Sequence, residues 1–297
     1  MSDDKFDASL ELLRRLDPRS IEQNLTSICS LLSSNNEDTE IVEELLSSID
    51  VPLKVSKCKE SGKEYLCCDY NRDGDSYRSP WSNQYYPPPE DDDDEEVSPP
   101  YPSELLRQLE FKANDAFDIY RDLYYEGAGV SSVYFWDTSD DDDEGEGSES
   151  TLEKGFAGVI LFKKETNDKT GKWDSIHVLE VLPEGKNKVL YKLTTSVILD
   201  LQNKETNSLS LSGNLTRQLE QSQLLDLNNG VNLETNHLIN IGTMVEKAEY
   251  NIRNVLQEVY FDKLKDIMLK DLRTVDGDAD KAVNAQQSDI IKGLEAL

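Results

Sequence analysis

The chain has 297 residues, which is long enough for one large domain or two smaller ones. Its formal net charge is −29, and nucleic acid is not expected as a partner, because phosphate binding needs a basic face. Two acidic runs, 90–96 and 140–149, hold seven acids each. Blocks of like charge repel one another and stay solvated, so both runs are predicted to be disordered loops.

Nothing in the sequence indicates a membrane protein or a secreted one. No hydrophobic run reaches membrane-spanning length, and the first four residues, MSDD, are acidic where a signal peptide would be basic. A cytoplasmic location is therefore expected. The four cysteines lack paired C-x-x-C spacing and only two histidines are present, so we expect reduced, mostly buried thiols and no metal or other cofactor.

Apolar residues at helical spacing predict three short helices in the first fifty residues, packed as a bundle or stalk. Pro18 is expected to end the first helix. Ser20 and Gln23 form a capping-box pattern at the start of the second helix. Ile41 and Leu45 mark the third helix.

The middle of the chain changes character twice. Residues 51–86 are rich in aromatics and turn residues and predict a strand-and-turn globule, and residues 87–102 form an acidic, proline-rich linker. A helix is expected over 103–129, capped by Ser103 and ended by glycines.

An antiparallel sheet is predicted over 130–220, because five consecutive strand patterns follow without an intervening helix. Residues 138–153 are expected to form a disordered acidic insert in it. The predicted strands are 130–136, 156–162, 173–181, 189–201 and 209–215.

Two helical patterns complete the chain. Apolar residues at steps of three and four predict a long helix within 236–275, suited to lie across a sheet face. After a break, segment 281–297 reads as a terminal amphipathic helix. It would either fold back or enter a groove on another protein. Its apolar side carries Ile290, Ile291, Leu294 and Leu297.

Residues 68–83, CDYNRDGDSYRSPWSN, admit two interpretations. Asp69, Asn71, Asp73 and Gly74 fit the first half of an EF-hand loop. The twelfth position of that loop needs a bidentate glutamate, however, and Pro80 stands there. We therefore favour a tight turn in which Asp and Asn side chains bond the backbone, Gly74 takes a positive φ, and Arg72 and Arg78 pair with the neighbouring acids.

The same sixteen residues closely resemble the signature of the β subunit of the heterodimeric F-actin capping protein, and further matches follow in family order along almost the whole chain. These matches are LLRRL (12–16), YRDLY (120–124), GVSSVY (129–134), GFAGVI (155–160), WDSIHV (173–178), LTRQ (215–218), and YF (260–261) followed by KDI (265–267).

The resemblance implies an α+β fold that is half of a mushroom-shaped α/β heterodimer. The five-stranded sheets of an obligate α subunit and this chain would join into one ten-stranded antiparallel sheet, each half crossed by a long helix. The implied function is to bind actin filament barbed ends and block subunit addition and loss, with no catalysis. It also implies a cytoskeletal location, in cortical actin structures.

The implied actin-binding residues lie near the C-terminus. Arg253 matches an arginine of the family's basic patch, which is implicated in actin and phosphoinositide binding, whereas Asn251 replaces the adjoining lysine. The terminal helix would place Ile290, Ile291, Leu294 and Leu297 in an apolar groove on actin.

Other classes of function remain as alternatives. The acidic runs would suit a chaperone or binder of basic proteins, and residues 69–74 a calcium-responsive protein. A related heterodimer could serve another actin-like filament assembly. An enzyme ranks last, because no nucleophile with a placed base, phosphate loop or metal cluster is present in the sequence.

Overall fold

The computed structural model describes residues 2–16, 20–33, 41–42, 45–46, 51–88, 102–125, 128–138, 152, 155–167, 171–185, 187–201, 213–228 and 230–258. The chain divides into two units, Met1–Ala248 and Glu249–Leu297. The acidic runs, most of the linker and the terminal segment 281–297 lie outside the described residues.

Two N-terminal helices pack through their apolar stripes. α1 (Ser2–Arg15) ends before Pro18, and α2 (Ile21–Ser33) begins directly after Ser20. Leu13 and Leu25 are buried in one cluster with Leu45, a residue of the predicted third helix. Of that third helix the structure describes four residues, and all four are helical.

Short strands and one turn of 3-10 helix form the globule. β1 (Lys54–Lys57) pairs with β2 (Glu64–Cys67). The 3-10 helix η2 (Asp69–Asn71) leads into a small second sheet. That sheet contains β3 (Arg72–Asp73), β4 (Ser76–Arg78) and β5 (Tyr85–Tyr86).

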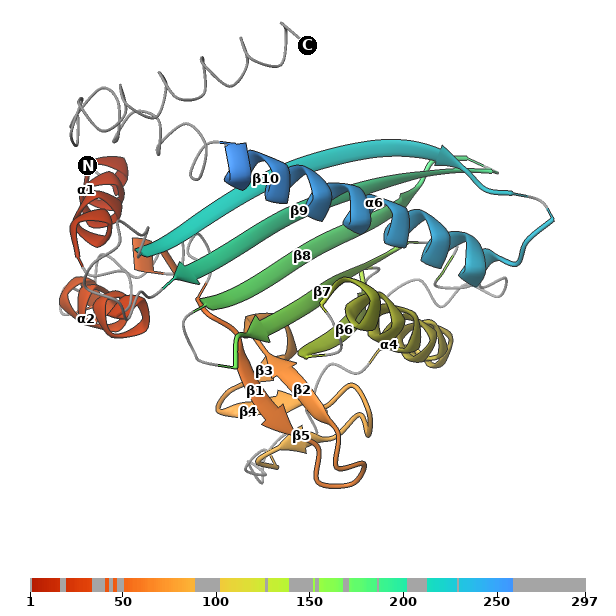
Figure 1. Cartoon of the computed structure of the whole chain (residues 1–297), viewed down its shortest axis with the longest axis horizontal. Helices are drawn as coiled ribbons and strands as arrows, with labels where there is room; N and C mark the ends of the chain where they lie inside the picture. The colour runs from red at the N-terminus through yellow and green to blue at the C-terminus, as the bar shows by residue number, and fades with distance from the viewer. Residues whose placement is uncertain are drawn as a thin grey trace, which may run out of the picture. The chain divides into compact units, whose positions relative to one another are not determined.

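The main sheet has five antiparallel strands, which confirms the predicted fold class. The strands lie in the order β10-β9-β8-β7-β6, so each is hydrogen-bonded to its neighbours in sequence and β6 and β10 are the edges (Figure 1). Their bounds are β6 Gly129–Asp137, β7 Phe156–Glu165, β8 Gly171–Pro183, β9 Lys188–Leu201 and β10 Gly213–Asp226.

The predicted extent of the last strand was wrong. Alternating leucines suggested 209–215, but β10 runs from Gly213 to Asp226 and pairs with β9 along its whole length. Its later residues alternate between half-buried and exposed positions and are mostly polar. An edge strand with one solvated face needs few apolar residues, so the apolar pattern underestimates it.

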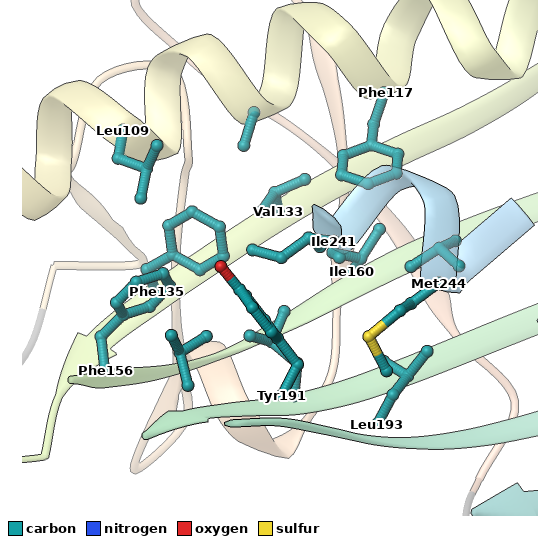
Figure 2. Close-up of a cluster of buried hydrophobic side chains, with 14 of the residues drawn as sticks. Leu109, Phe117, Val133, Phe135, Phe156, Ile160, Tyr191, Leu193, Ile241 and Met244 are labelled. Atoms are coloured by element: carbon teal, nitrogen blue, oxygen red, sulfur yellow. The ribbon is translucent and has the colours of Figure 1, made fainter. Parts of the chain in front are cut away.

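Two helices cover one face of the sheet. α4 (Glu104–Tyr124) and the part of α6 (Leu233–Leu256) up to Ala248 contribute to a single large cluster with the strands. Figure 2 shows Leu109 and Phe117 of α4 in the same buried cluster as Phe135, Tyr191 and Met244, which come from β6, β9 and α6. The two helices are also joined by contacts between Lys112 and Glu234 and between Tyr124 and Glu246.

The globule covers part of the opposite face. Leu53 and Leu66 pack with Tyr134, Val159 and Ile176, whose side chains point away from α4 and α6. The sheet therefore has two cores, one on each face. None of the helices in the described part of the chain is both long and apolar enough to cross a membrane.

The predicted role of Ser103 needs correction. Ser103 occupies the N-cap position of α4, but its side chain makes no capping bond. Its backbone N–H and its hydroxyl instead donate to the two carboxylate oxygens of Asp137, at 2.8 and 2.9 Å. Hydrogen bonds to an ionised carboxylate are stronger than those between neutral groups, so Ser103 joins the start of α4 firmly to the edge strand.

Candidate functional site

The segment 68–83 is built around a buried asparagine. Asn71 is 2% exposed, and its carboxamide oxygen accepts from the backbone N–H of Cys68 at 2.8 Å. Its amide group donates to the carbonyls of Leu66 at 3.3 Å and Arg78 at 2.9 Å. One side chain therefore joins three backbone positions, as the turn interpretation predicts.

An EF-hand loop would need this side chain free to bind a cation. Because Asn71 is turned inward and fully bonded, the calcium interpretation is not supported. Gly74 has a φ of +52°, which fits the turn. Among the residues that the structure describes, no group of three or more His, Cys, Asp or Glu side chains could hold a metal ion.

The two arginines of the segment have different partners. Arg72 is partly exposed and lies 3.8 Å from Asp69 and 3.7 Å from Asp75, as predicted. The same expectation for Arg78 was wrong, because Arg78 pairs with Glu110 of α4 instead. Its guanidinium donates to both carboxylate oxygens, at 2.9 and 2.8 Å, a bidentate geometry that gives strong and directional ion pairs.

Glu110 lies at the centre of a buried charged cluster. It is 0% exposed and also accepts from Arg107, whose guanidinium donates at 2.7 Å to the carbonyl of Pro80. Arg78 donates in addition to Asn83 at 2.8 Å. A buried carboxylate is tolerated only when it is paired and hydrogen-bonded, and here α4 and the segment 68–83 supply the partners together.

The β6 edge of the sheet is closed by side chains of α4. The backbone N–H of Val133 donates to Asn114 Oδ1 at 2.9 Å, and the carbonyl of Val133 accepts from Asn114 Nδ2 at 3.0 Å. The backbone N–H of Phe135 donates to Glu110 Oε2 at 2.7 Å. The N–H and C=O groups of Val133 and the N–H of Phe135, which an adjacent strand would otherwise bond, are therefore already hydrogen-bonded to α4.

The β10 edge differs. Within the part of the chain that the structure describes, β9 is the only strand paired with β10, over 14 residues of each strand. Half-buried Leu219 and Leu225 lie at the margin of the main core, and Leu224 on the other face is 48% exposed. A long, regular, partly apolar edge of this kind is a ready template for pairing with another strand.

The predicted actin-binding residues can be placed only in part. Arg253 lies in the last turn of α6, in the second unit, and pairs at 3.2 Å with the buried Glu249 one turn earlier. Its side chain is 36% exposed, so it is available to a partner only in part. Ile290, Ile291, Leu294 and Leu297 lie outside the described residues.

All four cysteines are free thiols, and Cys58 and Cys67 are buried. Burial raises the pKa of Cys67 to about 11 and that of Cys68 to about 12. Burial also acts to raise the pKa of Cys58, but hydrogen bonds with Ser61, Ser79 and Ser82 together outweigh it and lower the pKa to about 6. The thiols of Cys58, Cys67 and Cys68 therefore differ in acidity although all three lie in the same small globule.

Sequence reasoning missed Glu110 and Asn114. A signal was present, because both residues continue the inward stripe of α4 at steps of three and four. A polar residue inside an apolar stripe predicts a buried hydrogen-bonding role. Its partners on β6 could not be read from the helix alone.

Comparisons with known proteins agree with the resemblance. The family described as "F-actin capping protein, beta subunit" matches residues 6–268. The F-actin-capping protein subunit beta of Debaryomyces hansenii is 62% identical over 298 residues, covering 99% of each chain. The protein of the same name from Saccharomyces cerevisiae is 45% identical over 305 residues, covering 100% of each.

One solved structure supports the fold. The homodimeric actin capping protein alpha subunit from Plasmodium berghei superposes with a TM-score of 0.51 at 15% identity, covering 93% of this chain and 98% of the other. These comparisons give no support to an acidic binder of basic proteins. The chain belongs to the F-actin capping protein β subunit family.

Proposed function

We propose that this chain, with a capping protein α subunit, binds the barbed ends of actin filaments and blocks subunit addition and loss, independently of calcium. The observation that carries the proposal is the family match over residues 6–268, together with full-length relatives that carry the same name. The family is a structural actin-capping family, so we propose no catalytic step. We expect the protein among cytoplasmic actin filaments, and in cortical structures in particular.

The α subunit would join at β10. Strand addition to a sheet edge supplies main-chain hydrogen bonds and pockets for alternate side chains. β10 offers 14 residues of regular edge, and its residues alternate between half-buried and exposed from Gln218 to Asp226. A second five-stranded sheet added there would give the ten-stranded sheet expected from the family.

Actin contacts would come from the C-terminal part of the chain. Arg253 would bind an acidic surface of actin, and the apolar residues Ile290, Ile291, Leu294 and Leu297 would enter a groove. Joining two contacts by a tether raises avidity through effective concentration. Regulation by phosphoinositides would act through Arg253, the residue that matches the family's basic patch.

The primary test is elongation of pyrene-labelled actin from filament seeds, with this chain co-expressed with a capping protein α subunit. We expect the full-length heterodimer to stop barbed-end growth and truncation before Ser288 to weaken it. A soluble heterodimer that leaves growth unchanged would overturn the proposal. Deleting 90–96 and 140–149 should leave capping intact, whereas an acidic chaperone would lose its partner.

Arg253→Ala tests the basic residue in the same assay. Because a single charged contact contributes about 1–2 kcal/mol, we expect capping to weaken by roughly tenfold. Lys247→Ala is the matched control, since Lys247 is an exposed basic residue of the same helix. Equal capping by both variants would exclude Arg253 from the actin contact.

A further inference from the structure

Asn114 takes the place of a strand residue at the β6 edge. In an antiparallel ladder, a hydrogen-bonded pair of residues exchanges two N–H to carbonyl bonds. The Asn114 carboxamide makes both of these bonds to one residue, Val133, at 2.9 and 3.0 Å. A third bond, from Nδ2 to the carbonyl of Glu110 at 2.9 Å, holds the carboxamide in this orientation.

Polar side chains at the neighbouring turns of α4 also bond residues of β6, Glu110 through a backbone N–H and Asp118 through a side-chain hydroxyl. Glu110, Asn114 and Asp118 are spaced by four helical residues, a rise of about 6 Å per step. Their partners Phe135, Val133 and Ser131 are spaced by two strand residues, about 6.7 Å per step. Glu110 accepts from the Phe135 N–H at 2.7 Å, and Asp118 accepts from the Ser131 hydroxyl at 2.7 Å. The helix thus runs antiparallel to β6 in register with it.

Charge at the edge is balanced by the segment 68–83 and by α4 itself. The Glu110 side chain accepts hydrogen bonds as a carboxylate although it is 0% exposed, because Arg78 and Arg107 both form ion pairs with it. Arg78 is in turn fixed by Asn71, which donates to its carbonyl at 2.9 Å. The segment 68–83, which resembles the family signature, therefore holds the Glu110 carboxylate in place through Arg78, and Glu110 in turn bonds the β6 edge.

We propose that Glu110 and Asn114, aligned with β6 also by the contact of Asp118 with the Ser131 hydroxyl, close the β6 edge against strand addition, so that β10 is the one edge at which the sheet is extended. Each chain then accepts a single partner sheet, and assembly stops at the heterodimer instead of continuing edge to edge. These residues determine the specificity of assembly. The identity of the partner at β10 rests on the function proposed above, whereas closure of β6 does not.

The test uses the full-length heterodimer carrying Asn114→Leu, which keeps the branching and the number of heavy atoms of the side chain but cannot bond Val133. Leu109→Ala is the matched control, because Leu109 is buried in the same helix and makes no bond to β6. Amide hydrogen exchange is measured at Val133 and Phe135, and molecular mass by light scattering over a range of concentrations.

In the Asn114→Leu heterodimer we expect exchange at Val133 to rise by about tenfold, since one net hydrogen bond corresponds to roughly that factor. A species of twice the heterodimer mass should appear with increasing concentration. Leu109→Ala should produce neither a selective rise at Val133 nor the doubled mass. Unchanged exchange at Val133, or faster exchange in a particle that keeps the heterodimer mass throughout, would overturn the proposal.

Wild-type protein gives a second test if Asn114→Leu does not fold. The Val133 and Phe135 amides should exchange as slowly as those of the central strand β7, and they should do so with or without the α subunit. Exchange at the rate of an open edge would overturn the closure. Failure of the wild-type chain to form a heterodimer would instead contradict the proposed function. The exchange rates at Val133 and Phe135 would still test the closure of β6.

Discussion

The two edge strands of the central sheet, β6 and β10, differ in how their outward-facing backbone groups are bonded. At β6, backbone groups are bonded by Asn114 and Glu110 of α4, and the strand lies between two cores. At β10, the described structure contains a long strand paired only with β9, with Leu224 48% exposed. An edge strand exposes donors and acceptors that recruit other strands unless something covers them.

This difference teaches that buried polar residues can direct assembly as well as stabilise a fold. The β6 edge requires a buried carboxylate and two arginines, an arrangement that contributes little net stability compared with an apolar core. Under the proposal above, this arrangement restricts pairing to the other edge, where β10 is bonded on one side only among the described strands. The predictions below disturb each edge in turn.

The largest effect is expected at the closed edge, from Arg78→Met. Arg78 and Glu110 have side chains 4% and 0% exposed, and removing one partner of a buried pair leaves an uncompensated charge. We expect the free energy of unfolding to fall by about 3–5 kcal/mol, measured by urea unfolding of the heterodimer.

Arg72→Met is the control within the same segment. Its ion pairs at 3.8 and 3.7 Å join side chains that are 45% exposed or more, and such pairs contribute about 0–1 kcal/mol. If both variants lost the same stability, the distinction between the two arginines would be wrong.

A smaller effect is expected from pH, acting on the part of the core between β9 and α6. His237 is 0% exposed and its Nδ1 lies 2.8 Å from the Tyr191 hydroxyl. Burial lowers the pKa of this histidine to about 4 from 6.5. Between these values the unfolded chain binds more protons than the folded chain, so the contribution to stability is complete above pH 6.5 and is lost as pH falls to 4.

The loss should approach about 3 kcal/mol, the product of the shift and 1.36 kcal/mol per unit. It is measured as the difference in unfolding free energy between wild type and His237→Gln at each pH. This difference removes the opposite contribution of Asp174, whose pKa is raised by burial although Lys163 acts to lower it. A difference that stays constant from pH 7 to 4 would show that folding does not shift the pKa of His237.

The smallest effect is expected at the open edge, from Leu224→Lys. Leu224 is half exposed in the chain alone, so the stability of this chain should change little. If the partner sheet covers it, the lost burial of about 1.5 kcal/mol should raise the dissociation constant of the heterodimer by roughly tenfold. Fluorescence titration with the α subunit measures this constant.

Leu123→Lys provides the comparison for that variant. Leu123 is 74% exposed on α4, far along the sheet from β10, and its substitution should leave the dissociation constant unchanged. Equal weakening by both substitutions would argue against β10 as the joining edge.

The sequence by itself determined the element types, the antiparallel meander and the family. Apolar periodicity identified α4, α6 and the central strands because their burial is one-sided or complete and leaves a regular pattern. It also favoured a turn over a calcium loop at residues 69–74, since the required glutamate was replaced by Pro80. Local chemistry was sufficient for the elements and the turn, and the resemblance of the quoted segments was sufficient for the family.

Only the tertiary structure decided which polar groups meet. Ser103 bonds Asp137 instead of capping its helix, Arg78 pairs with Glu110, 32 residues away, and β10 extends further than its leucines indicate. Closure of β6 depends on the match between four helical residues and two strand residues across the interface. Such contacts join residues distant in sequence, and their geometry exists only once helix and sheet are packed, so no local pattern encodes it.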